Sequence, residues 1–284
     1  MKAGLGKLVA AVAAVAAALT LSTAGTSSAD GTGLRAYGLL NNGKQLCSFT
    51  TDNPGTLDWV KNIPGLTGDT LLIGLDFRVQ DGKLYGVGNQ GGIYTIGIAD
   101  MSVRKVSQLS VALQGTRFGV DFNPPANRLR VVSDVGQNLR HNIDDGVGAG
   151  STTVDSPLNT PPSTATTTGV TAVAYTNNDL SAATGTTLFD LDTTADLIAL
   201  QAPPNNGTLN PTGTLGVNAS LDAGMDIFSD LSNGRTTTVS AFATITPEHG
   251  VASLYSVELL TGWATLIGEF PLAVTEIAIA LDTN

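Results

Sequence analysis

A short apolar motif recurs along this chain, and its spacing limits the folds that the chain can adopt. Ile73-Gly74-Leu75-Asp76-Phe77 and Phe118-Gly119-Val120-Asp121-Phe122 match position by position, and their aspartates are 45 residues apart. In the second copy, large apolar residues alternate with a glycine and an aspartate, which is typical of a β-strand. Weaker copies begin at Val170 and Gly224. The sequence therefore predicts a repeated β-unit.

Each copy is followed by further strand patterns of the same kind. After the second copy, the two prolines of Asn123–Asn127 interrupt any β-ladder. Leu129–Val132 and Leu139–Ile143 then predict two more strands. A fourth strand is expected in every set, at Val103–Leu109, Ser151–Val154, Thr212–Val217 and Trp263–Phe270. Four strands in about 40–50 residues is the size of one β-propeller blade.

The two ends of the chain predict how the ring of blades closes. Three strand patterns precede the first full set, at Leu34–Leu39, Lys44–Phe49 and Leu57–Ile63, and one pattern, Val274–Leu281, follows the last. We predict that the last strand completes the first sheet, which gives an all-β propeller of five four-stranded blades. A β-sandwich with irregular hairpins is the alternative. Segments 151–169 and 201–210 are rich in Thr, Pro, Asn or Ser and predict surface loops.

The first 29 residues have the composition of a secretory signal peptide. Lys2 and Lys7 precede an apolar run, Leu8–Leu21, and Ser27-Ser28-Ala29 provides small residues for cleavage. The run has about 14 residues, whereas a membrane-spanning helix needs about 20. We therefore expect a secreted, extracellular protein, with one propeller domain over residues 30–284 and no membrane insertion after cleavage.

Charge and cysteine content narrow the partners and the chemistry. Cleavage would leave 12 basic residues against the 24 acidic ones, a balance that disfavours nucleic acid and anionic lipid. We expect a monomer that binds an extracellular ligand or protein. Cys47 is the only cysteine, so we expect a buried thiol rather than a disulfide. His141 and His249 are too few for a zinc site with three or four Cys and His ligands.

Several segments resemble one known family. Phe118–Pro124, Arg128–Asp134 and Gly136–Arg140 are similar to the signature of a bacterial secreted family known as domain of unknown function 4394. Further matching segments are Leu72–Arg78, Leu84–Gly86, Ala174–Asn177 and Leu188–Asp190, in which Phe189 replaces an expected tyrosine. The resemblance covers nearly the whole mature chain. It implies export and a repetitive β architecture, and it implies no reaction and no site.

Aspartates on the first strands are the first candidate site. Asp76 and Asp121 occupy matching positions, and Asp226 and Asp282 are expected two places away with the same side-chain parity. If the first strands line a central tunnel, these carboxylates could gather there. They could then bind Ca²⁺ or act as acid and base in a hydrolysis. We favour the alternative that each aspartate accepts backbone amides of the next blade. We assign no cofactor and keep calcium as the one candidate metal.

A dense set of polar side chains around one hairpin is the second candidate, and it could form a ligand-binding rim. Its members are Arg128, Arg130, Ser133, Asp134, Gln137, Asn138, Arg140 and His141. Arg128 and Arg130 lie on one strand face and could bind one carboxylate together. The alternative, which we favour, is a structural network in which Asp134 pairs with an arginine while Gln137 and Asn138 cap the turn.

Two functions are compatible with these residues. We favour a non-catalytic propeller that binds a ligand or a protein, because this function needs only exposed polar loops. The alternative is a secreted hydrolase or lactonase that uses carboxylates at the tunnel, with or without calcium. No Gly-x-Ser-x-Gly motif or Ser-His-Asp set supports a nucleophilic enzyme.

Overall fold

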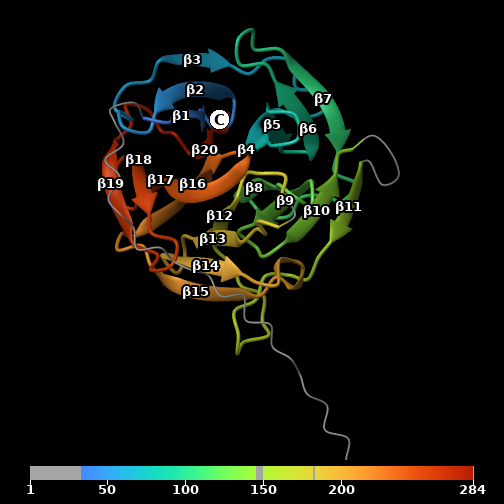
Figure 1. Cartoon of the computed structure of the whole chain (residues 1–284), viewed down its shortest axis with the longest axis vertical. Helices are drawn as coiled ribbons and strands as arrows, with labels where there is room; N and C mark the ends of the chain where they lie inside the picture. The colour runs from blue at the N-terminus through green and yellow to red at the C-terminus, as the bar shows by residue number, and fades with distance from the viewer. Residues whose placement is uncertain (1–32, 145–149, 182, 284) are drawn as a thin grey trace, which may run out of the picture. The chain divides into compact units, whose positions relative to one another are not determined.

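The computed structural model describes residues 33–144, 150–181 and 183–283. Within these residues, twenty strands form five four-stranded antiparallel sheets, which surround a common axis as the blades of a β-propeller (Figure 1). The predicted five-bladed fold is thus confirmed, and the sandwich alternative is wrong. The predicted signal peptide lies outside the described residues.

The blades follow one another around the ring in chain order, and each runs from an innermost to an outermost strand. Blade 1 contains β20 (Glu276–Ile279), β1 (Arg35–Leu40), β2 (Gln45–Thr50) and β3 (Trp59–Asn62). Blade 2 contains β4 (Leu72–Arg78), β5 (Lys83–Gly88), β6 (Gly92–Ile96) and β7 (Val103–Gln108). Blade 3 contains β8 (Phe118–Asn123), β9 (Arg128–Ser133), β10 (Asn138–Asn142) and β11 (Ser151–Val154). Blade 4 contains β12 (Val170–Tyr175), β13 (Leu188–Asp192), β14 (Leu197–Gln201) and β15 (Leu209–Thr214). Blade 5 contains β16 (Ala219–Ser232), β17 (Arg235–Pro247), β18 (Ser253–Val257) and β19 (Ala264–Glu269).

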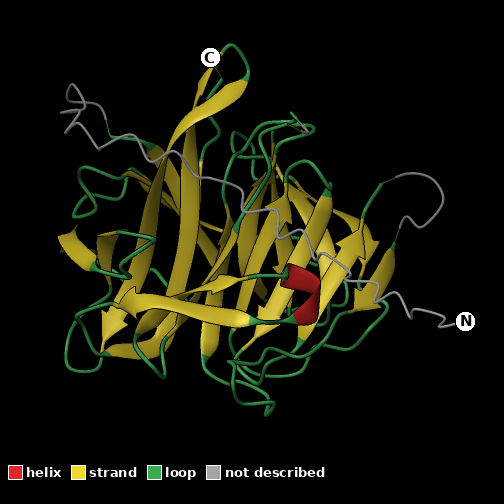
Figure 2. Ribbon diagram, turned by 60° about the horizontal axis from the view of Figure 1, so that its bottom comes forward, coloured by secondary structure: helices red, strands yellow, loops and turns green. Residues whose placement is uncertain are grey.

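The ring closes through blade 1, as the strand count predicts. Strand β20 pairs antiparallel with β1, with Ala36 opposite Ile279 and Leu39 opposite Glu276. This pairing joins the last strand of the chain to the first three. Strand β15 begins at Leu209, three residues before the expected strand, because a single 3₁₀ turn at Pro204–Asn206 shortens the loop (Figure 2).

The core lies between the blades, where each sheet buries its faces against its neighbours. Tyr37 and Leu39 of blade 1, for example, pack with Leu72 and Leu75 of blade 2. Cys47 is fully buried, as expected, and burial raises the pKa of its thiol to about 12. The outer strands are largely exposed. Radial packing of this kind leaves only short sheet edges.

Close contact between inner strands depends on glycine. A Cβ atom on Gly119 would lie 2.5 Å from the backbone nitrogen of Val173, and one on Gly224 would lie 2.6 Å from the Cα of Glu276. Both distances are shorter than a carbon can tolerate. These glycines therefore let β8 approach β12, and β16 approach β20, around the axis.

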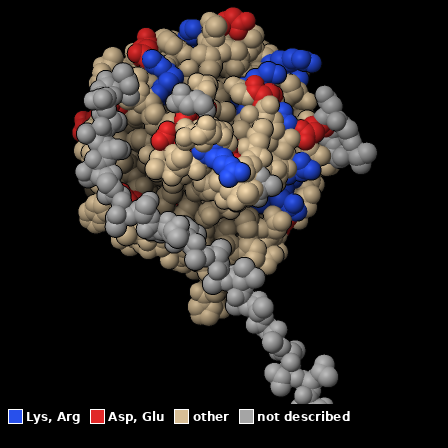
Figure 3. Space-filling view, viewed as in Figure 1, with Lys and Arg blue, Asp and Glu red and all other residues tan. Residues whose placement is uncertain are grey.

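The outer surface carries few charges. Lys, Arg, Asp and Glu make up 13% of the sequence, and on the face drawn in Figure 3 they are scattered between wide uncharged areas. Among the described residues, no helix has the length and apolar character needed to cross a bilayer.

Candidate ligand site on the axis of the propeller

Three aspartates form a belt around the axis, each on the innermost strand of its blade. Asp76 of β4, Asp121 of β8 and Asp226 of β16 are 4–6% exposed, and one oxygen of each lies within 4.8 Å of the others. We call these three residues the aspartate belt. The sequence indicates that Asp76, Asp121, Asp226 and Asp282 could gather if the first strands line a tunnel, and the structure brings the first three together.

The belt binds one backbone amide on the inner strand of every blade. Asp76 accepts hydrogen bonds from the amides of Phe77 (2.6 Å) and Phe122 (2.7 Å). Asp226 likewise accepts from Ile227 and Ile279, both at 2.6 Å.

Asp121 completes the set by accepting from the amide of Tyr175 on β12. Three carboxylates thus serve five equivalent amides, one in each blade.

The pattern explains why only three of the five blades need an aspartate. Ala278 of blade 1 and Ala174 of blade 4 occupy the belt position and cannot accept a hydrogen bond. In blade 2, which follows Ala278, one oxygen of Asp76 accepts from the amide of the next residue, Phe77. In blade 5, which follows Ala174, one oxygen of Asp226 accepts in the same way from Ile227. Buried amides without a partner are costly, so the belt stabilises the closed ring.

Asp226 therefore lies at the same position as Asp76 and Asp121, and the expected two-residue offset is wrong. Its carboxylate makes the same pair of amide contacts as that of Asp76. Asp282 is not part of the belt. Its carboxylate instead accepts a hydrogen bond of 2.7 Å from the amide of Leu231, beyond the end of β20.

Burial keeps the belt from ionising fully. Burial raises the pKa of Asp226 to about 6, and it raises the pKa values of Asp76 and Asp121 further with help from the neighbouring carboxylates. The amide hydrogen bonds act in the opposite direction without cancelling this effect. The belt oxygens could hold a cation or share protons, since no basic residue in the described part of the chain pairs with them.

A cavity of about 330 Å³ opens beside the belt, at the end of the axis where the inner strands begin. We call it the axial cavity. All five blades contribute to its wall, in which polar and apolar residues are about equally represented. Its lining residues are Leu39, Asn42, Gly43, Leu71, Leu72, Ile73, Thr116, Arg117, Phe118, Thr171, Asp222, Ala223, Thr275 and Glu276. This mixture is typical of small-molecule sites.

Glu276 is the one buried charged group in the wall of the axial cavity. It is 5% exposed, and burial, followed by the charges of Asp226 and Asp76, raises its pKa well above the usual range. Arg117 and Asp222 lie at the rim, where Arg117 Nε donates to Asp222 Oδ1 at 2.8 Å. Their side chains are 43% and 42% exposed, so this pair remains in contact with solvent.

The sequence matches one family over most of its length. The family model described as a domain of unknown function (DUF4394) matches residues 45–280. The chain belongs to this family. No curated protein matches the sequence of this DUF4394 chain.

The DUF4394 chain is similar in structure to proteins of different kinds. A Bacteroides thetaiotaomicron protein of unknown function is 13% identical, with 88% of this chain and 67% of that chain covered and a TM-score of 0.48. A chain of a nidogen/laminin complex is 10% identical, with 88% and 99% covered and a TM-score of 0.47. Glutaminyl cyclase from Myxococcus xanthus is 10% identical, with 79% and 96% covered and a TM-score of 0.44. TM-scores below 0.5 support no argument about function.

The predicted hairpin rim is divided among separate places in the DUF4394 structure. Arg130, Asn138 and Arg140 meet around Asp155 at the interface of blades 3 and 4. Arg130 Nη1 lies 2.7 Å from Asp155 Oδ2, and Arg140 Nε lies 2.6 Å from the same oxygen. Arg130 is 1% exposed, so this group is a buried structural network rather than a binding rim.

The remaining hairpin residues make local contacts. Arg128 faces Asp144 at 3.9 Å, so Arg128 and Arg130 do not bind one carboxylate as expected. Asp134 accepts from the amide and hydroxyl of Thr116 instead of an arginine. The expected capping of the turn by Gln137 and Asn138 is wrong: the Gln137 side chain bonds the backbone of residues 112 and 114, and that of Asn138 donates to the carbonyls of residues 156 and 204. The hydroxyl of Ser133 bonds within the turn instead, where it accepts from the amide of Gln137.

His141 is a buried structural residue of blade 3. Its ring nitrogens lie 2.8 Å from the hydroxyl of Ser107 and 2.9 Å from that of Thr152. Burial lowers the pKa of His141 to about 4, so the ring is neutral at physiological pH.

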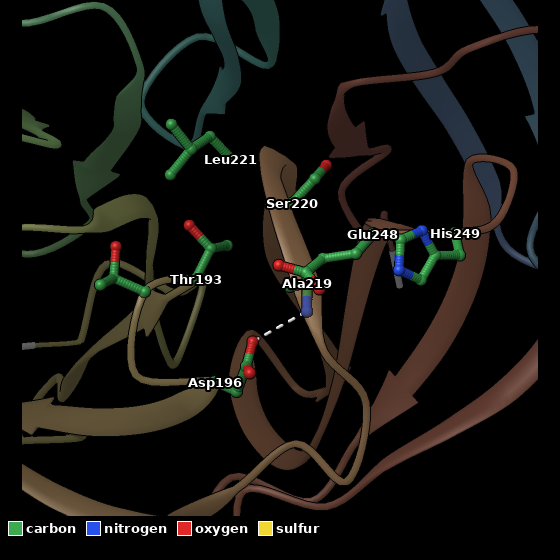
Figure 4. A pocket seen from close by; sticks show the side chains of 8 residues that line it. Thr193, Asp196, Ala219, Ser220, Leu221, Glu248 and His249 are labelled. Carbon is green, nitrogen blue, oxygen red and sulfur yellow. Dashed lines mark hydrogen bonds between the residues drawn. The ribbon is translucent and has the colours of Figure 1, made fainter.

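A wider and more open hollow flanks the axial cavity along β16. Its volume is about 600 Å³, and Figure 4 shows Glu248 and His249 on one side of it and Thr193 on the other. Asp196 lies at its edge and accepts a 2.8 Å hydrogen bond from the amide of Ala219. We call it the flanking hollow. Ser220 lines it, and Asp222, two residues later, lines the axial cavity.

The axial cavity adds functional candidates that sequence reasoning missed, chiefly Glu276 with the Arg117–Asp222 pair. Comparison of the repeats could have identified Glu276. Blades 2, 3 and 5 have Gly74, Gly119 and Gly224 two residues before the belt, and only blade 1 has a long charged side chain there.

Proposed function

We propose that this protein is a non-catalytic binding protein whose small ligand occupies the axial cavity. The supporting observation is that residues from all five blades build one concave, mixed apolar and polar wall at the end of the axis. A volume of about 330 Å³ is at the lower end of the range for small-molecule sites. We also propose that the chain is exported by its N-terminal segment and acts outside the cell as a monomer.

The contacts of the belt argue against the hydrolase alternative. An acid and a base for hydrolysis must reach the substrate, whereas Asp76 and Asp226 use both oxygens for backbone amides. Their removal would disturb the ring whether or not any reaction occurs. Binding needs no such group, and the cavity beside the belt provides the space.

A blocking substitution tests this proposal. Thr275 is half-buried in the wall of the axial cavity, and Ser220 is half-buried in the flanking hollow. Thr275→Phe should fill the axial cavity, and Ser220→Phe is the matched control. We expect small molecules from a chemically diverse panel to raise the melting temperature of wild type and Ser220→Phe but not of Thr275→Phe.

Two results would contradict the proposal. In the first, compounds that stabilise wild type also stabilise Thr275→Phe equally, which places binding elsewhere. In the second, wild type hydrolyses members of a lactone and ester panel, and Asp121→Asn abolishes the reaction while remaining folded by circular dichroism. That second result would favour the enzyme instead.

A further inference from the structure

Glu276 occupies a position at which the inner strands of the other four blades have glycine or alanine. At the position two residues before the belt, the other blades have Gly74, Gly119, Ala172 and Gly224. Gly119 and Gly224 leave no room for a side chain, because a Cβ atom would lie 2.5–2.6 Å from the next strand. In blade 1, by contrast, Glu276 occupies this position and lines the axial cavity. The repeat itself does not require this residue.

Glu276 also lacks a counterion. Its carboxyl accepts a hydrogen bond from the amide of its neighbour Ile277. Among the described residues, no arginine, lysine or histidine pairs with it, and the charges that act on it belong to Asp226 and Asp76. A buried carboxylate without a counterion is costly. The site therefore lacks the positive group that would stabilise an ionised Glu276.

The buried ionisable groups around Glu276 are all acidic. Asp76, Asp121 and Asp226 lie just beyond Glu276 along the axis, and none of them pairs with a basic residue in the described part of the chain. Arg117 is the one basic residue in the cavity wall, and Asp222 neutralises it at the rim. Such a cavity favours cations over anions, because a bound cation stabilises the ionised form of these carboxyls and an anion does not. The apolar part of its wall, including Ile73 and Phe118, suits a hydrocarbon body.

We infer that the axial cavity binds a small organic cation, an amine with an apolar body, whose ammonium group pairs with Glu276. This inference rests on the proposed ligand role of the axial cavity. On binding, Glu276 releases to solvent the proton that burial favours, and the ammonium donates to the resulting carboxylate. The hydrocarbon part contacts the apolar part of the wall. A charge-assisted hydrogen bond of this kind discriminates against a neutral or anionic ligand of the same shape.

The test uses three molecules of the same shape and different charge: benzylamine, benzyl alcohol and benzoate. Isothermal titration calorimetry with the full mature chain measures each affinity. We expect benzylamine to bind at least about tenfold more tightly than the other two. Glu276→Gln should weaken benzylamine binding by about ten- to a hundredfold. Glu258→Gln, at an exposed turn, is the matched control and should bind as wild type does.

Further variants separate this inference from the proposed function. Glu276→Asp keeps the charge and should retain a preference for benzylamine, which covers the case in which Glu276→Gln does not fold. Equal binding of benzylamine and benzyl alcohol by wild type overturns the cation inference. So does unchanged benzylamine binding by a folded Glu276→Gln. The binding function still holds in both cases if Thr275→Phe removes the signal.

Calcium chloride is the fourth probe. If calcium stabilises wild type in a Glu276-dependent way and benzylamine does not bind, the inferred organic cation is replaced by a metal ion. If no probe gives a signal that Thr275→Phe removes, the cation inference is overturned, and the diverse panel then decides the proposed function separately.

Discussion

Replacing one belt carboxylate by an amide should produce a stability change that depends on pH. In Asp226→Asn, the side-chain oxygen can accept one of the two amides of Ile227 and Ile279, while its NH₂ group faces the other. A buried amide without an acceptor costs about 1–3 kcal/mol. At pH 4, where Asp226 is protonated in the folded protein, we expect the variant to be less stable by about this amount.

At higher pH a second effect opposes the first. The folded pKa of Asp226, about 6, lies above its ordinary 3.8, so the folded state holds the proton more tightly than the unfolded state. The stability from this group is complete below about pH 4 and is lost as pH rises through about 6. The difference corresponds to about 3 kcal/mol. Asparagine does not titrate, so the deficit of the variant should shrink by about 3 kcal/mol between pH 4 and pH 8.

Urea unfolding at each pH measures the effect, and Asp179→Asn is the matched control. Burial alone would raise the pKa of Asp179, but hydrogen bonds from Thr236 and Ser181 hold it below the usual range. The stability from Asp179 is therefore lost only as pH falls below about 4, so its variant should differ from wild type by a nearly constant amount from pH 5 to pH 8. A constant difference for Asp226→Asn over the same range would refute the reasoning.

Three more substitutions or conditions test the packing. Gly119→Ala places a Cβ atom 2.5 Å from the nitrogen of Val173 and should lower the unfolding free energy in urea by about 1–3 kcal/mol; an unchanged value would mean that β8 and β12 can separate. Arg130→Met removes the more buried of the two arginines that pair with Asp155. Because Arg140 still pairs with Asp155, the cost should be about 1–3 kcal/mol, whereas the more exposed Arg128→Met should cost about 0.5 kcal/mol or less. Because the belt oxygens already bind amides, the melting temperature should be the same in EDTA and in calcium chloride, and stabilisation by calcium would instead indicate a metal in the belt.

The repeat predicts the fold well because each blade is encoded locally. The alternation in Phe118–Phe122 and its match at Ile73–Phe77 set the blade, and the strands left over at the two ends set the closure. What the repeat cannot predict is the sharing of five amides by three carboxylates. That arrangement depends on Ala174 and Ala278, which look unremarkable in sequence but oblige the next aspartate to use both oxygens.

Contacts between side chains of different hairpins or loops are the hardest to predict from the sequence. Arg130 pairs with Asp155, which follows β11, rather than with Asp134 in its own hairpin, and spacing within a hairpin carries no information about such a partner. Asp226, by contrast, could have been placed correctly, because Gly224-Met225-Asp226-Ile227 aligns with Gly74-Leu75-Asp76-Phe77 without an offset. Glu276 escapes notice because its strand is isolated at the end of the chain, so comparison with the glycines of the other blades requires the register of the ring.

A crystal structure of the protein soaked with benzylamine would locate the ligand directly. We expect the aromatic ring in the axial cavity, against Ile73 and Phe118, with the ammonium nitrogen about 2.8 Å from a carboxylate oxygen of Glu276. Benzylamine bound elsewhere, or in the cavity with its nitrogen directed away from Glu276, would contradict the proposed recognition of a small cation at this end of the axis.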